Sequence, residues 1–165
     1  MKRMVGLLGL LLGLAALTAC TLGGTLQELS QTLSVDLSQG TVVEETDDHG
    51  GFHGDGERWV EISLEEEISS ALEEAGWQEL PLPEPLEAAL YGVTKVEGDR
   101  TIAEGPCFQR EIPRVSNGYY FFQDRHSEAT DPTDPEELME RNSFNFTVAL
   151  YDRDSQTLYY GEEDT

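Results

Sequence analysis

The segment from Asp47 to Glu57 holds the side chains of this sequence that are best suited to chemistry. It contains two of the three histidines, His49 and His53, together with Asp55 and further acidic residues, for four carboxylates in all. Imidazole nitrogens and carboxylate oxygens are the ligands that zinc and similar divalent ions take from proteins. One hypothesis is therefore a divalent metal site in this segment, with zinc as the candidate ion.

The same segment also has an explanation that needs no ligand. Its glycines, at positions 50, 51, 54 and 56, allow the backbone conformations of a turn, and the polar side chains would then bond to backbone groups. The spacing matches neither an EF-hand loop, nor H-E-x-x-H, nor the glycine patterns that bind phosphates or dinucleotides. A plain hairpin tip therefore stays open beside the metal site.

A second polar group follows the aromatic stretch at residues 119–122. It contains Asp124, His126 and Glu128. If this group lies beside the first segment in the fold, His126 would join His49 and His53 as a third imidazole. His126 is therefore a candidate metal ligand whose role depends on the tertiary structure.

No catalytic residue can be assigned from the sequence. A G-x-S-x-G nucleophile motif is absent, and Cys107 has no histidine near it in sequence, only the cation of Arg110. We expect Cys107 to be a small packed residue rather than a reactive thiol. Acidic pairs are too frequent to indicate glycosidase chemistry. A non-enzymatic protein is favoured, and a metal-dependent hydrolase is the enzymatic alternative.

The first twenty residues have the layout of a secretory signal. Lys2 and Arg3 precede an apolar run over residues 5–17, which is shorter than an ordinary transmembrane helix. The next residues, Leu17-Thr18-Ala19-Cys20, resemble the lipobox of bacterial lipoproteins. The resemblance implies that residues 1–19 are removed and that Cys20 carries a lipid. The protein would then be extracytoplasmic and anchored to the outer face of the cytoplasmic membrane.

The charge of the chain limits its partners. There are 33 Asp and Glu against 10 Lys and Arg, a net charge of −23. Without Lys2 and Arg3 the balance is 33 against 8, or −25. Such a body does not bind nucleic acid, and anionic lipid head groups repel it. The lipid would be the membrane contact, and the expected partner is a protein or another cell-surface component.

Between the signal and the domain we expect a tether. Residues 20–34 are mostly Thr, Ser, Gly, Gln and Leu with one charge, a composition typical of linkers. Leu22, Leu26, Leu29 and Leu33 fall on one helical face, so part of this tether is expected to form a short amphipathic helix. A single domain would then occupy residues 35–165.

The pattern of that domain predicts the α+β class. Alternation and β-branched or aromatic residues indicate strands, two of which would form a hairpin with the Asp47–Glu57 segment at its tip. The sheet should be antiparallel, with one main helix, capped by Ser63 and Glu66, and one short helix packed on one face. The expected strands lie at 35–46, 58–62, 93–96, 119–122, 144–151 and 157–160; the helices lie at 64–75 and 84–91, one helical turn lies near 136–139, and loops lie around Gly98 and Gly105.

Several longer motifs carry a further resemblance. They are HGGFHGDG at residues 49–56, NGYYFF-x-DRHSE at 117–128, DP-x-DPEEL at 131–138 and SFNFTVALYD at 143–152. Together they look similar to a group of small uncharacterised secreted lipoproteins of Gram-positive gut bacteria. That resemblance implies a location and a single domain, and it implies no activity.

Overall fold

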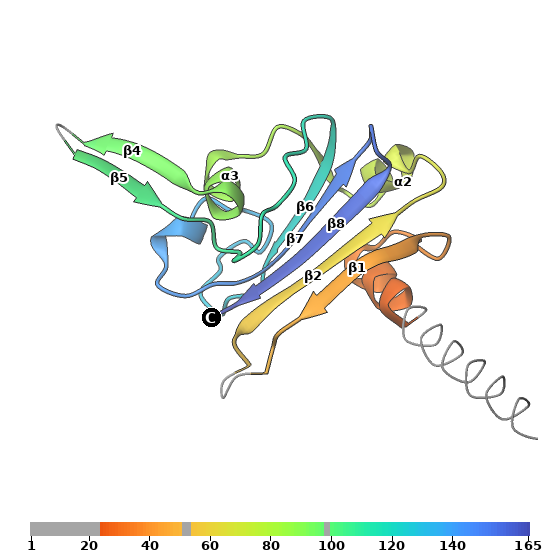
Figure 1. The fold of residues 1–165 in the computed structure, drawn as a ribbon, viewed down its shortest axis with the longest axis horizontal. Coiled ribbons are helices and arrows are strands. Elements are labelled where there is room, and N and C mark those ends of the chain that lie inside the picture. Colours follow the sequence, from red (N-terminus) through yellow and green to blue (C-terminus); the bar gives the residue numbers. More distant parts are fainter. Residues whose placement is uncertain (1–23, 51–53, 98–99) are drawn as a thin grey trace, which may run out of the picture.

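The computed structural model describes residues 24–50, 54–97 and 100–165, and it has the expected α+β architecture (Figure 1). Six strands form one antiparallel sheet in the order β1-β2-β8-β7-β6-β3, and β4 and β5 form a separate hairpin. The elements are β1 Thr41–Asp47, β2 Gly56–Ser63, α2 Ser69–Glu74, β3 Gln78–Glu79, α3 Glu84–Tyr91, β4 Val93–Glu97, β5 Arg100–Glu104, β6 Gly118–Asp124, the 3-10 helix η1 Leu138–Glu140, β7 Asn145–Asp152 and β8 Thr157–Asp164.

Most of the predicted elements are confirmed. The hairpin of β1 and β2, the aromatic strand β6 and the C-terminal hairpin of β7 and β8 lie where the alternation placed them. The short helix α3 begins with Pro85 in its first turn and ends at Gly92, whose φ of 74° suits glycine. Local sequence signals therefore determine most of the sheet.

The helices cover both faces of the sheet, whereas we expected them on one. Side chains alternate along β7, and those of both faces are apolar: Ala149 packs in one core cluster and Val148 in the other. The first face is covered by residues 24–33 and by Leu72 of α2. The second face is covered by α3 and the chain that follows β5. A sheet that is apolar on both faces needs a layer on each.

Residues 24–33 are helical and pack in the domain, which corrects the prediction of a tether over this part of 20–34 and of 35 as the domain start. Residues 20–23 of the predicted tether lie outside the described residues. The amphipathic helix is confirmed, since Leu29 and Leu33 are fully buried against the first face of the sheet. Trp77 Nε1 also donates a hydrogen bond to the Leu33 carbonyl at 3.3 Å. Burial of this leucine stripe fixes the helix on the sheet. No helix among the described residues is long and apolar enough to cross a membrane.

Arg58 of β2 ties this helix to the sheet. Its side chain is only 10% exposed, and its guanidinium donates to Glu28 at 2.6 Å and to Glu45 of β1 at 3.0 Å. Glu162 of β8 lies 4.0 Å away. Burial opposes the charge of Arg58, but the hydrogen bonds to Glu28 and Glu45 outweigh burial and raise its pKa. One guanidinium therefore joins the helix and three strands.

The predicted start of the main helix is wrong. Ser63 does not cap a helix, because it is the last residue of β2 and is paired with Thr157. The next amide, that of Leu64, donates to the Gln156 carbonyl at 2.9 Å. The helix α2 begins only at Ser69, and Gly76, with a φ of 85°, follows its end as expected. Pairing of Ser63 with β8 therefore takes the place of the predicted helix cap formed by Ser63 and Glu66.

Two strands of the structure are missing from the predicted strands: β3, which has only two residues, and β5. Residues 93–97 form β4 as expected, but residues 100–104, which we assigned to loops, pair with them as β5. The antiparallel register joins Val93 to Glu104 and Glu97 to Arg100. In Figure 1 this hairpin projects away from the main sheet. Short strands of this kind show weak local patterns, since their preference depends on the partner strand.

The leucine stripe gives a test of where the domain begins. We expect Leu33→Ala to lower the free energy of unfolding by about 3 kcal/mol, because it leaves a cavity at a fully buried position. The exposed neighbour Gln31 is the control, and Gln31→Ala should change it by less than about 0.5 kcal/mol. Urea unfolding measures both. If the two variants were equally stable, residues 24–33 would have to be assigned to the tether and not to the domain.

Candidate functional site

His49, the first predicted ligand, is held between two carboxylates. Its Nδ1 lies 2.8 Å from Asp47 Oδ1, and its Nε2 lies 3.1 Å from Asp164 Oδ2 at the end of β8. Burial disfavours the protonated ring, but the hydrogen bond to Asp47 and the charges of Asp164 and Glu162 outweigh it and raise the pKa of His49. Two carboxylates therefore lie within 3.1 Å of the two ring nitrogens of His49 and favour its charged form.

His126 does not join His49. Its Nε2 lies 3.2 Å from Ser143 Oγ, and its Nδ1 accepts the Glu128 amide at 3.2 Å. The two segments do approach each other, but through the neighbouring residue: Arg125 Nη2 donates to Asp164 Oδ2 at 3.1 Å. A guanidinium therefore occupies the place at which we expected a third imidazole.

The remaining predicted ligands do not complete a metal site in the described structure. His53 lies outside the described residues. Asp55 lines a pocket, described below, and none of the described residues that line this pocket is a histidine. Within residues 24–50, 54–97 and 100–165, no group of three or more His, Cys, Asp or Glu side chains is arranged to hold a metal ion. The predicted imidazole cluster is therefore absent from the described part of the chain.

An acidic pocket of about 370 Å³ lies beside His49, where the start of β2 and the end of β8 meet the loop after β1. Five of its lining residues are acidic, and none of the described residues that line it is Lys or Arg. We call it the acidic pocket; its lining residues are Asp48, Asp55, Gly56, Glu57, Gln109, Glu163, Asp164 and Thr165.

Glu163 is the unusual member of the acidic pocket. It is only 7% exposed, and the register of β8 places it directly opposite Glu57 of β2. Glu57 Oε2 accepts the Gln109 amide at 2.8 Å, whereas the buried Glu163 Oε2 has no hydrogen-bond partner among the described residues. Burial, followed by the charges of Glu57, Asp164 and Asp48, raises the pKa of Glu163 to about 7. The site therefore contains a buried carboxyl group, and no Lys or Arg lies among the described residues that line the pocket around it.

An apolar hollow of about 410 Å³ adjoins the acidic pocket. The two share Glu163 and Thr165. Cys107 also lines this hollow, and burial, followed by the charge of Glu163, raises the pKa of its thiol to about 12, as expected for a packed rather than a reactive residue. We call it the apolar hollow; its lining residues are Gly105, Pro106, Cys107, Met139, Phe144, Glu163 and Thr165.

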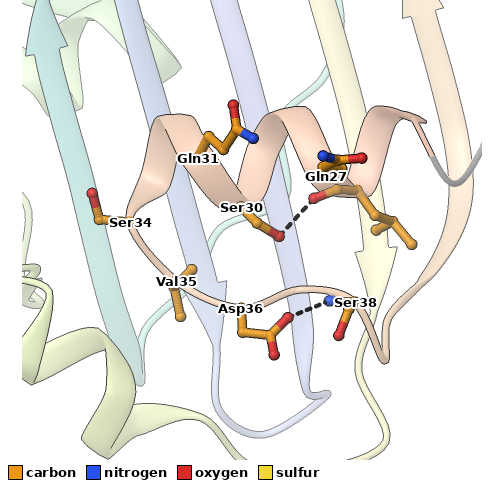
Figure 2. Close-up of a pocket in the computed structure, with 8 residues that line it drawn as sticks. Gln27, Ser30, Gln31, Ser34, Val35, Asp36 and Ser38 are labelled. Carbon is orange, nitrogen blue, oxygen red and sulfur yellow. Dashed lines mark hydrogen bonds between the residues drawn. The ribbon is translucent and has the colours of Figure 1, made fainter.

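A larger groove of about 620 Å³ runs beside the N-terminal helix (Figure 2). Its polar groups bond locally: Ser30 Oγ donates to the Leu26 carbonyl at 2.6 Å, and the Ser38 amide donates to Asp36 Oδ1 at 2.9 Å. Asp36 is the one ionisable side chain among the described residues that line it. These groups complete the helix and the following turn, so the groove offers no chemistry of its own.

Comparison of the chain with known proteins finds no matching family model, no matching curated protein and no matching solved structure. The site that stands out on geometry is the acidic pocket with Glu163. Neither Glu163 nor its strand neighbours formed part of the predicted site. The available signal was the spacing along the strand. Glu163 lies four positions after Tyr159, so a carboxylate falls on the same face of the strand as an aromatic side chain that packs in the core.

The raised pKa of Glu163 predicts how stability changes with pH. The folded protein binds this proton more tightly than the unfolded chain, whose glutamate titrates near 4.5. The stabilisation is therefore complete below pH 4.5 and is lost as the pH rises through about 7. Relative to Glu163→Gln, the wild type should lose on the order of 3 kcal/mol between pH 4 and pH 8.

Urea unfolding across this pH range, with the two proteins compared at each pH, measures that difference. The variant removes the titrating group and keeps its shape, so the effects of the other carboxylates cancel. Parallel stability curves for the two proteins would show that Glu163 has an ordinary pKa.

Proposed function

We propose that this protein is a non-enzymatic, extracytoplasmic binding domain that a lipid on Cys20 holds at the outer face of the cytoplasmic membrane. The observation that carries the proposal is the order of the first twenty residues: a basic start, a short apolar run and Leu17-Thr18-Ala19-Cys20. These residues precede the described structure. The partner would be a protein or a cell-surface component.

The described domain supports a binding role through the way it uses its ionisable groups. Asp124 is buried and paired with Arg141, and Arg58 is buried among carboxylates. The thiol of Cys107 is held in its neutral form. These groups stabilise the fold and are not poised to transfer protons or attack a substrate. The acidic pocket, by contrast, has the charge and the volume of a binding site.

A divalent-metal site, with zinc as the first candidate and metal-dependent hydrolysis as its possible use, is the second candidate function. The position of His49 between Asp47 and Asp164, next to the carboxylates of the acidic pocket, is the observation that favours it. His53 and Asp55 would be its further ligands, as the sequence pattern suggested.

Lipid attachment gives the first test. In bacteria that express the full-length gene, we expect the protein to incorporate an alkyne analogue of palmitate and to sediment with membranes. Cys20→Ala should abolish both, because it removes the acylated sulfur. Cys107→Ala is the matched control, since it removes the other cysteine of the chain and should keep the label. Labelling that survives Cys20→Ala, or that depends on Cys107, would contradict the anchor.

Thermal unfolding separates the two candidate functions. Under the proposed function, zinc added after EDTA treatment leaves the Tm unchanged. A metal-binding function instead predicts about 2.7 kcal/mol of stabilisation at a hundred times the Kd, which is a rise of about 5–10 °C. His49→Ala should abolish that rise. A rise that His49→Ala leaves intact would place the metal elsewhere.

A further inference from the structure

We infer that the acidic pocket and the apolar hollow together bind an organic cation: an ammonium or guanidinium group carried next to an apolar group. A lysine or arginine side chain beside a hydrophobic residue of a peptide has this chemistry, and so does a free aryl-alkyl amine. The inference deepens the proposed binding function by naming the class of ligand.

The charge requirement comes from the pair of Glu57 and Glu163. Adjacent carboxylates on neighbouring strands repel each other, and a buried carboxylate oxygen without a partner is costly. Glu163 is nine-tenths buried, and its Oε2 is enclosed without a hydrogen-bond donor among the described residues. A ligand with several N–H donors and a positive charge would offset both costs.

None of the described residues supplies this pair with a cation of its own. The charged and titratable groups that act on Glu163 are Glu57 of β2, Asp164 of its own strand, Asp48 and His49 of the loop, and Cys107. His49 and Arg125 are already paired with Asp164. The facing residue on β7, Phe146, carries no charge. The site therefore has a deficit of positive charge at Glu57 and Glu163.

The shape of the site favours an organic cation over a metal ion. The two adjoining hollows, of about 370 and 410 Å³, have the size of small-molecule sites, which is far more than a dehydrated ion fills. The described residues do not converge on a metal position. Beyond Glu163, the apolar hollow offers Pro106, Met139 and Phe144 as contacts for the apolar part of a ligand.

Binding should depend on pH in a defined direction. A bound cation stabilises the charged form of Glu163, whose pKa is about 7 in the free protein, so binding releases a proton. Affinity should therefore rise about tenfold from pH 6 to pH 8.

In the experiment, cationic probes are titrated into the full-length protein in a neutral detergent. Isothermal calorimetry measures the affinity, and the backbone amide chemical shifts show which residues respond. Phenethylamine is the free-amine probe, and acetyl-phenylalanyl-lysine amide is the peptide probe. The peptide with glutamine in place of lysine is the neutral control. We expect saturable binding of a cationic probe, shifts centred on the two hollows, and no binding of the control peptide.

The variants test the residues. Glu163→Gln should weaken binding at least tenfold and remove its pH dependence, and Glu57→Gln should weaken it as well. Glu66→Gln is the matched control: it removes the same charge from an exposed position outside both hollows and should leave the affinity within twofold. If Glu163→Gln fails to fold, Glu57→Gln provides the decisive comparison.

The probes distinguish the source of the cation. Binding of the peptide alone supports a polypeptide partner, and binding of phenethylamine alone supports a small amine; each supports the inference. No binding of either probe, equal binding of the control peptide, or a response to zinc, calcium or magnesium alone would overturn it. Lipid labelling at Cys20 is independent of all these results, so failure here leaves the proposed anchor standing.

Discussion

The guanidinium of Arg58 is the interaction on which the arrangement of the first face depends. In a chain with 33 acidic residues, the N-terminal helix, β1 and β8 all bring carboxylates to the same place. Without a buried cation there, those elements would repel one another. Arg58 is one of only 10 Lys and Arg in the whole sequence, so its position decides which acidic elements can lie side by side. Burial of Leu29 and Leu33 then holds the helix over the sheet.

On the second face of the same strands, the acidic side chains have different neighbours. Glu57 and Arg58 are neighbours in sequence and project to opposite faces of β2, because side chains alternate along a strand. On the first face, carboxylates surround a cation. On the second face, Glu57 faces Glu163 of β8 and the space beside them is hollow. A single step along β2 thus separates a buried guanidinium that is paired with carboxylates from a buried carboxyl group beside which no Lys or Arg lines the described pocket.

The sequence predicted the elements better than the site, and the residues explain why. The strand around Phe146 and the helix between Pro85 and Gly92 carry their signals locally, as alternation and as helix-end residues. The burial of Glu163 arises from its register with β2 and from a chain segment more than fifty residues away, around Gln109. The capping box at Ser63 failed for the same reason, since strand pairing outweighed a local preference. The histidine pattern was visible but did not show that Arg125, rather than His126, reaches Asp164.

The chain is helical from Gly24, the first described residue, and this has a consequence for the proposed anchor. Four residue steps separate Cys20 from Gly24, and a fully extended chain covers at most about 14 Å in that number. Electrostatic screening in physiological salt extends over about 8 Å. A lipid on Cys20 would therefore keep this acidic body near the range of the membrane's surface charge. The composition of the lipid head groups and the ionic strength would then set how far the domain can tilt on the membrane. They would also set the directions from which a partner can approach it, in place of a long flexible linker.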